Sequence, residues 1–189
     1  RDSIIAKLRE AGGDPSAIGT SERAKLALES FQSTAAYDTA VSNELESRLM
    51  DEEVPSIINL STKRGSTLRY GENPHQPASF YPNGGEPTGL GAATQHGGKP
   101  LSYNNYLDLD GALRLAENII HSCADHEHGC VVVKHTNPCG AAVGSSQSEA
   151  WKDALASDPE SAFGCVIAFT KEVELETATA IGEHFFECM

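Results

Sequence analysis

The sequence predicts an α/β fold, in which helices pack in layers on a sheet, and three observations support this class. Two short apolar runs, at 130–133 and 165–169, are typical of buried strands. The segments that flank these runs, 108–120, 148–156 and 175–186, have apolar residues at helical spacing. This alternation of helices and strands is typical of layers joined by right-handed crossovers, so we expect parallel strands, with Asp108 capping the first of these helices.

The first part of the chain has a different character. A short helix is expected over 2–10, and a longer helix over 20–49 keeps apolar residues at helical spacing. The sequence then becomes strand-like and rich in glycine, with short strand candidates at 57–60 and 78–81. We therefore expect a module boundary at residues 55–56.

Composition narrows the classes of function. The chain has 189 residues, of which 39% are hydrophobic, so it can bury a core without disulfides or metal. Its net charge of −13 repels phosphate backbones and anionic lipid, and we expect neither nucleic acid nor a membrane as a partner. An anionic ligand must therefore be held by local cations. Five cysteines, an odd number at uneven spacing, indicate reduced thiols and a cytoplasmic location.

The densest group of reactive side chains follows the first apolar run. Lys134 and His135 come directly after it, where ligands of open α/β sheets bind. Neighbouring side chains on a strand point to opposite faces, but a turn at Asn137-Pro138 would let these two converge. The alternative is a strand that simply leaves the core and ends in polar residues.

Two further segments contain residues suited to binding. In LRYGENPHQ at 68–76, Arg69 offers a planar fork for phosphate or carboxylate, and Tyr70 offers a stacking face. In DPESAFG at 158–164, Gly164 permits close backbone approach to a ligand. The alternatives are a surface turn for the first segment and, for the second, an ordinary turn with the phenylalanine in the core.

A cluster of potential zinc ligands is a weaker candidate. Zinc sites use Cys and His at short separations, but the cluster contains no C-x-x-C pair, and we expect a solvated loop without metal. Cys139, four residues from His135, is expected to be a small buried thiol in the turn rather than a nucleophile. The cluster consists of His121, Cys123, His126, His128 and Cys130.

Four long segments follow one another along the chain: LRYGENPHQ at 68–76, GKPLSYNNYLDLDGAL at 98–113, VVVKHTNPCGAAVG at 131–144 and DPESAFG at 158–164. In this order they resemble the family of AICAR transformylase/IMP cyclohydrolase. A fifth, FQSTAAYD at 31–38, resembles the helix that joins the two activities of that family. The resemblance implies that 1–55 is the tail of a methylglyoxal-synthase-like cyclohydrolase domain with the linking helix. It implies that 56–189 is an incomplete first transformylase subdomain with cytidine-deaminase-like layers.

The resemblance also implies an activity, the transfer of a formyl group from 10-formyltetrahydrofolate to the 5-amino group of AICAR. By position in the motif KHTNPCG, His135 would be the general base and Lys134 would stabilise charge on the formyl oxygen. Arg69 and Tyr70 would hold the phosphoribosyl portion of AICAR, and Gly164 would line the same site.

Other expectations follow from the same resemblance. They are a homodimer, IMP cyclohydrolase activity in the full-length protein, and no required metal. Folate contacts would come mainly from sequence beyond Met189, so we expect no formyl transfer by these residues alone. Cys165 departs from the family, since many relatives have a second glycine there. The alternative function is a non-catalytic α/β module that binds a nucleotide or zinc.

Overall fold

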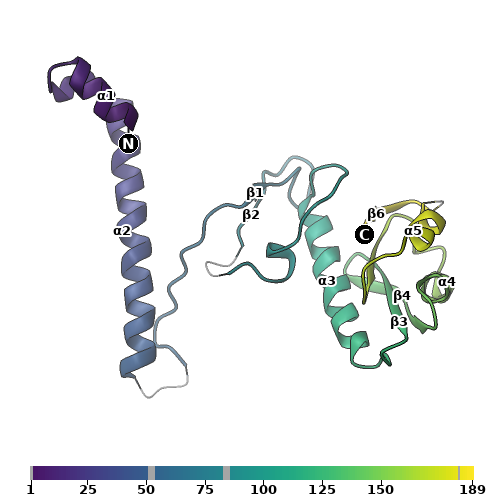
Figure 1. Cartoon of the computed structure of the whole chain (residues 1–189). Helices are drawn as coiled ribbons and strands as arrows, with labels where there is room; N and C mark the ends of the chain where they lie inside the picture. Colours follow the sequence, from purple (N-terminus) through teal and green to yellow (C-terminus); the bar gives the residue numbers. More distant parts are fainter. Residues whose placement is uncertain (1, 51–53, 83–85, 183) are drawn as a thin grey trace. The chain divides into compact units, whose positions relative to one another are not determined.

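The computed structural model describes residues 2–50, 54–82, 86–182 and 184–189. They form two compact units, one up to Thr62 and the other from Lys63 to Met189 (Figure 1). The division lies close to the change of character expected at 55–56. Which domains of an enzyme the two units represent stays a prediction.

The first unit consists of helices followed by an extended segment. Its elements are α1 (Asp2–Glu10), the 3-10 turn η1 (Pro15–Ala17) and α2 (Thr20–Leu49), so both expected helices are confirmed. None of the thirty described residues of α2 is buried within this unit. The strand expected at 57–60 is wrong: these residues lie outside any strand, and Leu60 is 84% exposed. Strand propensity without a hydrogen-bonding partner does not make a strand.

The second unit is built on a four-stranded sheet with the order β4-β3-β5-β6. The central strand β3 (His128–Lys134) pairs antiparallel with both β4 (Asn137–Gly144) and β5 (Cys165–Phe169). At the edge, β6 (Phe186–Cys188) runs parallel to β5. A small antiparallel ribbon of β1 (Ser66–Thr67) and β2 (Ser79–Phe80) precedes the sheet, followed by the 3-10 turn η2 (Gly89–Gly91).

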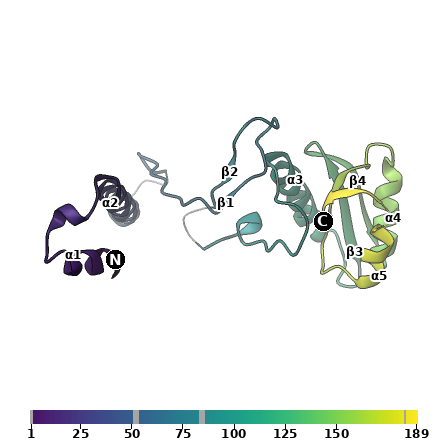
Figure 2. The ribbon, with the colours of Figure 1, turned by 90° about the horizontal axis from the view of Figure 1, so that it is seen from above.

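Helices cover both faces of this sheet, as Figure 2 shows from above. On one face, α3 (Tyr103–Ile120) packs its alanines against Val131 and Val133 of β3. On the other face, α4 (Gln147–Ser157) and α5 (Leu175–Ile181) pack against Cys130 and Val132. Alternate residues of one strand therefore enter two cores. The mixed α/β class is confirmed, whereas the cytidine-deaminase-like layering stays a prediction.

The expected parallel direction is wrong for β3, because both of its neighbours run antiparallel to it. The apolar run in β3 reflects burial on both faces, and burial on both faces does not determine strand direction. The helix expected at 175–186 is shorter than predicted: it ends at Ile181, and a strand begins at Phe186.

The start of α3 also differs from the prediction. Asp108 does not cap it, since the helix begins five residues earlier at Tyr103. The cap is Ser102, which forms a capping box with Asn105, both side chains being buried. Across residues 2–50, 54–82, 86–182 and 184–189, no helix has the length and apolar character needed to cross a bilayer.

Candidate functional site

The Lys134-His135 pair lies where β3 turns back into β4. Lys134 pairs with Asn137, and the two residues between them form the turn. His135 has φ +53° and Thr136 has φ +62°, and positive φ at both central residues is characteristic of a type I′ hairpin turn. The turn expected at Asn137-Pro138 is wrong, because these residues begin β4. Pro138 lies beside the bulge in this edge strand, where proline is tolerated.

This turn is strained. Residues other than glycine rarely adopt positive φ, and a β-branched residue such as Thr136 does so least readily. Each such residue costs about 1–3 kcal/mol unless its surroundings hold it in place. Two contacts do so: Asp108 Oδ1 accepts the Thr136 N–H at 2.7 Å, and Asn137 Nδ2 donates to His135 O at 2.8 Å. Strain that the surroundings sustain in this way is a mark of functional sites.

The two reactive side chains differ in their contacts. Lys134 is half-buried, and its Nζ donates to the Phe163 carbonyl oxygen at 2.6 Å. His135 is exposed. Next along the chain from that carbonyl is Gly164, with φ +73° and its N–H donating to Phe185 O at 2.9 Å. The structure therefore brings Lys134 and the segment of Gly164 together. The Phe163 ring is 61% exposed, so it does not enter the core.

Arg69 and Tyr70 lie against the beginning of α3. The Arg69 N–H donates to Leu101 O at 2.9 Å, and the Tyr103 N–H donates to Tyr70 O at 3.0 Å. The Arg69 guanidinium is exposed, and its Cζ lies 4.9 Å from the centre of the Tyr70 ring. The backbone of this segment is therefore fixed. The guanidinium donates from Nη2 to the Tyr70 hydroxyl at 3.4 Å and keeps further N–H donors that can meet an anion.

One helix holds both halves of the candidate site. Tyr103 of α3 binds the Arg69–Tyr70 segment, and Asp108 of the same helix binds the hairpin turn. The two anchors are five positions apart in the helix, which is about 8 Å along its axis. The charges of Arg69 and Asp108 also act on one thiol: burial first, then Glu187 and Asp108, raise the pKa of Cys188 to about 11, and Arg69 opposes them.

The neighbouring thiol of Cys139 is not an activated nucleophile. Burial raises the pKa of Cys139, the charge of Asp158 acts in the same direction, and Lys134 opposes them with a smaller effect. A thiol whose pKa lies above its usual range is protonated near neutral pH. Two thiols of the core are shifted further, since burial raises the pKa of Cys130 to about 12 and that of Cys165 to about 11.

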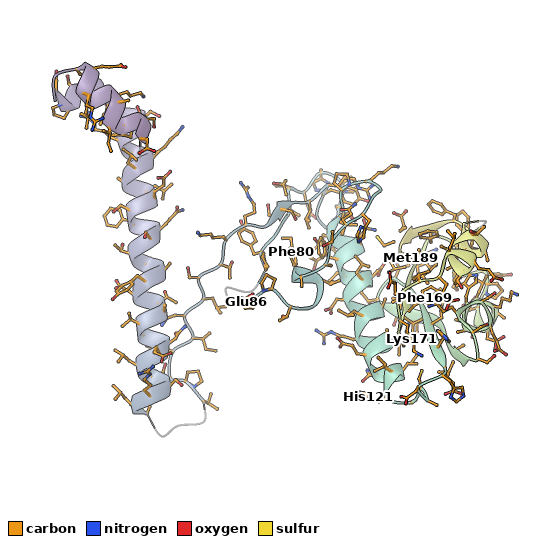
Figure 3. The ribbon with its side chains drawn as sticks, in the orientation of Figure 1. Phe80, Glu86, His121, Phe169, Lys171 and Met189 are labelled. Atoms are coloured by element: carbon orange, nitrogen blue, oxygen red, sulfur yellow. The ribbon has the colours of Figure 1, made fainter. Side chains whose placement is uncertain are left out.

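The cluster considered for zinc does not converge. Within the part of the chain that the structure describes, no group of three or more His, Cys, Asp or Glu side chains is arranged to hold a metal ion. His121 lies exposed at the end of α3, as Figure 3 shows, whereas Cys130 is buried in the core. The loop between them is fixed by Lys171, which is labelled in the same figure and whose Nζ donates to Asp125 O at 2.6 Å.

Gly111 provides a test of how closely α3 approaches the turn. A methyl group there would lie 3.6 Å from Thr136 O and from Val133 Cγ1, an ordinary contact distance. Glycine within a helix is destabilising by about 0.5–1 kcal/mol relative to alanine. We expect Gly111→Ala to raise the free energy of unfolding by that amount in urea titrations. Gly164→Ala, at positive φ, is the contrasting variant and is expected to lower it. A loss of stability in Gly111→Ala would show a closer packing than the structure gives.

Two contributors to the site were missed from the sequence. Asp108 lies in the segment at 98–113, but its carboxylate was interpreted as a helix cap. The Phe163 carbonyl that binds Lys134 belongs to the backbone, and no side-chain pattern signals it. The sequence does contain a signal that Asp108 is not the helix cap. Ser102, with Asn105 three residues later, marks a helix start before it.

Comparison with known proteins identifies one family over nearly the whole chain. Residues 2–189 match the model of the family described as AICARFT/IMPCHase bienzyme. The chain is 40% identical over 188 residues to the bifunctional purine biosynthesis protein PurH of Persephonella marina, covering 98% of this chain and 35% of that protein. It is 41% identical over 193 residues to the protein of the same name from Nostoc punctiforme, covering 100% and 35%. The chain thus spans about a third of the length of these curated relatives.

Proposed function

The chain belongs to the AICARFT/IMPCHase bienzyme family, and from this premise we propose that it supplies the base and part of the nucleotide site for formyl transfer. The reaction is the transfer of a formyl group from 10-formyltetrahydrofolate to the 5-amino group of AICAR, in purine biosynthesis. The observation that carries the proposal is the Lys134-His135 pair, presented by a strained hairpin turn beside the segment of Gly164.

The reacting amine requires a base. Its lone pair is delocalised toward the neighbouring carboxamide, so it is a weak nucleophile until its proton is removed. His135, exposed on the turn, takes this proton as the new C–N bond forms, which is a usual task of histidine near neutral pH. The bond from the formyl carbon to the folate nitrogen breaks, and that nitrogen takes up a proton in turn.

Lys134 stabilises the negative charge that develops on the formyl oxygen. An ammonium group has three N–H donors, and one of them is occupied by the Phe163 carbonyl at 2.6 Å. The contact fixes the ammonium group and leaves two donors for the substrate. A donor held in place before the reaction stabilises the transition state without the cost of reorganisation.

Arg69 and Tyr70 hold the phosphoribosyl portion of AICAR. The guanidinium presents a fork of N–H donors to phosphate, and the chain as a whole, with net charge −13, repels an anion. Local cations such as Arg69 therefore determine whether the nucleotide binds. We further propose that the enzyme is homodimeric and cytoplasmic and that it also has IMP cyclohydrolase activity. Its folate site would be formed largely by parts of the protein outside this chain.

The first test uses the 189-residue chain with AICAR in calorimetric titrations. We expect measurable binding that Arg69→Ala weakens about 10- to 100-fold, because a hydrogen bond to a charged group contributes about 1.5–3 kcal/mol. Arg114→Ala is the matched control, since it removes an equal charge from an exposed arginine that pairs with Asp110. Equal weakening by both variants would show a general charge effect and contradict the assignment of Arg69.

The same chain is expected to show no formyl transfer when 10-formyltetrahydrofolate is added. It spans about a third of its relatives, and orienting two reactants is worth about 7–11 kcal/mol of a barrier. Losing the site of one reactant therefore removes measurable turnover. Robust formyl transfer by the chain would show that the catalytic unit is smaller than we propose. If the full-length protein binds AICAR but shows no formyl transfer, the alternative of a non-catalytic nucleotide-binding module would be favoured.

A further inference from the structure

We propose that Asp108 is a positioning residue, whose carboxylate fixes the hairpin turn and thereby the direction in which His135 faces its substrate. The inference rests on the proposed role of His135 as the base. Asp108 lies on α3 and the turn lies between β3 and β4, so the contact joins elements 28 residues apart in the sequence.

Asp108 provides an acceptor for a backbone N–H that the pairing of the strands leaves without a partner. The ladder between β3 and β4 ends at Lys134 and Asn137, so the N–H of Thr136 lies outside it. Asp108 Oδ1 accepts this N–H at 2.7 Å. A hydrogen bond to an ionised acceptor is about twice as strong as one between neutral groups. The bond therefore opposes the tendency of Thr136 to leave positive φ.

The backbone conformation of the turn decides where the imidazole lies. The φ angles of +53° at His135 and +62° at Thr136 set the direction of the His135 Cα–Cβ bond. Lys134 has a separate anchor, because its Nζ is held by the Phe163 carbonyl. Loss of the Asp108 contact would therefore move the base relative to the ammonium group, rather than move the two together.

The anchor of the nucleotide-binding segment is also separate. Arg69 and Tyr70 are held through backbone hydrogen bonds to Leu101 and Tyr103, and neither bond involves Asp108. A positioning role at the turn thus predicts a loss in kcat with little change in the KM for AICAR. The carboxylate charge is a second variable, because replacing Asp108 by alanine removes the charge together with the hydrogen-bond acceptor.

Three variants separate these effects. Asp108→Ala removes both the acceptor and the charge, whereas Asp108→Asn removes the charge and keeps an oxygen that can accept the Thr136 N–H. Asp108→Ser, whose hydroxyl is too short to reach the turn, replaces the alanine variant if that protein folds poorly. The matched control is Asp110→Ala, since Asp110 lies on the same helix and pairs with Arg114 at 2.8 Å.

The first measurement does not depend on any activity. Amide hydrogen exchange of the 189-residue chain, followed by NMR, should show the Thr136 N–H protected in the wild type and in Asp108→Asn. We expect its exchange to accelerate at least ~10-fold in Asp108→Ala, which is about the weight of one hydrogen bond. Asp110→Ala should leave it unchanged. An unchanged exchange rate in Asp108→Ala overturns the inference, whatever the reaction proves to be.

The second measurement is formyl transfer by the full-length enzyme, meaning a protein of the relatives' length that contains these residues. We expect Asp108→Ala to lower kcat about 10- to 100-fold, since a displacement of about 1 Å costs about that much. The KM for AICAR should stay within about threefold, and Asp108→Asn should restore most of kcat. Equal losses in both variants, or normal kcat in Asp108→Ala, overturn the positioning role. Normal kcat in a His135 variant would refute the proposed base instead and leave the exchange result standing.

Discussion

Replacing His135 by alanine in the full-length enzyme is expected to lower kcat for formyl transfer by about 10²–10⁴, the usual contribution of general base catalysis. The KM for AICAR should change little, because we propose that Arg69 and Tyr70, on a separate segment, hold the nucleotide. Steady-state assays with both substrates measure the two constants. The loss should fall on kcat because the base acts on the amine only as the C–N bond forms.

A matched control is available on the same unit. His126 lies exposed in the loop between α3 and β3, and His126→Ala should leave kcat unchanged. Added imidazole should restore part of the activity of His135→Ala, because the side chain it replaces is exposed on the turn and leaves room for a small base. Near-normal turnover in His135→Ala would show that this residue is not the base, and Lys134 would be the next residue to test.

The turn around His135 shows how a local sequence pattern can misplace an element. The roles of Lys134 and His135 stay a prediction. The turn was misplaced by two residues, since Asn137-Pro138 is a strong local turn signal whereas His135-Thr136 is not. The edge position of β4 and its bulge tolerate the proline, and pairing with β3 then forces the turn upstream. The pairing partner, rather than the local preference, determines the result.

The sheet also differs in part from what the sequence predicts. Burial of β3 and β5 was predicted, because an apolar run without alternation requires cover on both faces. The expected parallel direction is wrong for β3, since helices on both faces bury parallel and antiparallel strands alike. The contact of Asp108 with the turn is also beyond local patterns: its partner Thr136 lies 28 residues away, and only the packing of α3 on the sheet brings them together.

Among the glycines that the structure describes, Gly140 is the one whose replacement by alanine is expected to cause the largest loss of stability. Gly140 lies in β4 opposite Val132, and at this point the strand packs directly on α4. A methyl group at Gly140 would overlap the Ala154 carbonyl oxygen and lie 2.8 Å from the carbonyl carbon. Both are backbone atoms of a helix, so no side-chain rotation relieves the overlap. Either β4 or α4 must move.

Overpacking of a core typically costs about 1–3 kcal/mol, and a clash with helical backbone belongs at or above the upper end of that range. We expect Gly140→Ala to lower the free energy of unfolding by about 3 kcal/mol or more. The single tryptophan, Trp151 of α4, is buried in the same core, and its fluorescence in urea titrations measures the change. The matched control is Gly97→Ala, since a methyl group there meets nothing within 4 Å and should leave the midpoint unchanged.

The same variant tests whether the strand supports the site. Gly140 lies on the strand that leads out of the His135 turn, so a displacement of β4 from α4 is transmitted along the hairpin. Faster amide exchange at Thr136 in Gly140→Ala, under conditions where the protein remains folded, would show this transmission directly. An unfolding midpoint equal to that of Gly97→Ala would instead show that β4 and α4 lie farther apart than the structure gives, because a rigid contact with backbone atoms leaves no other way to accommodate the methyl group.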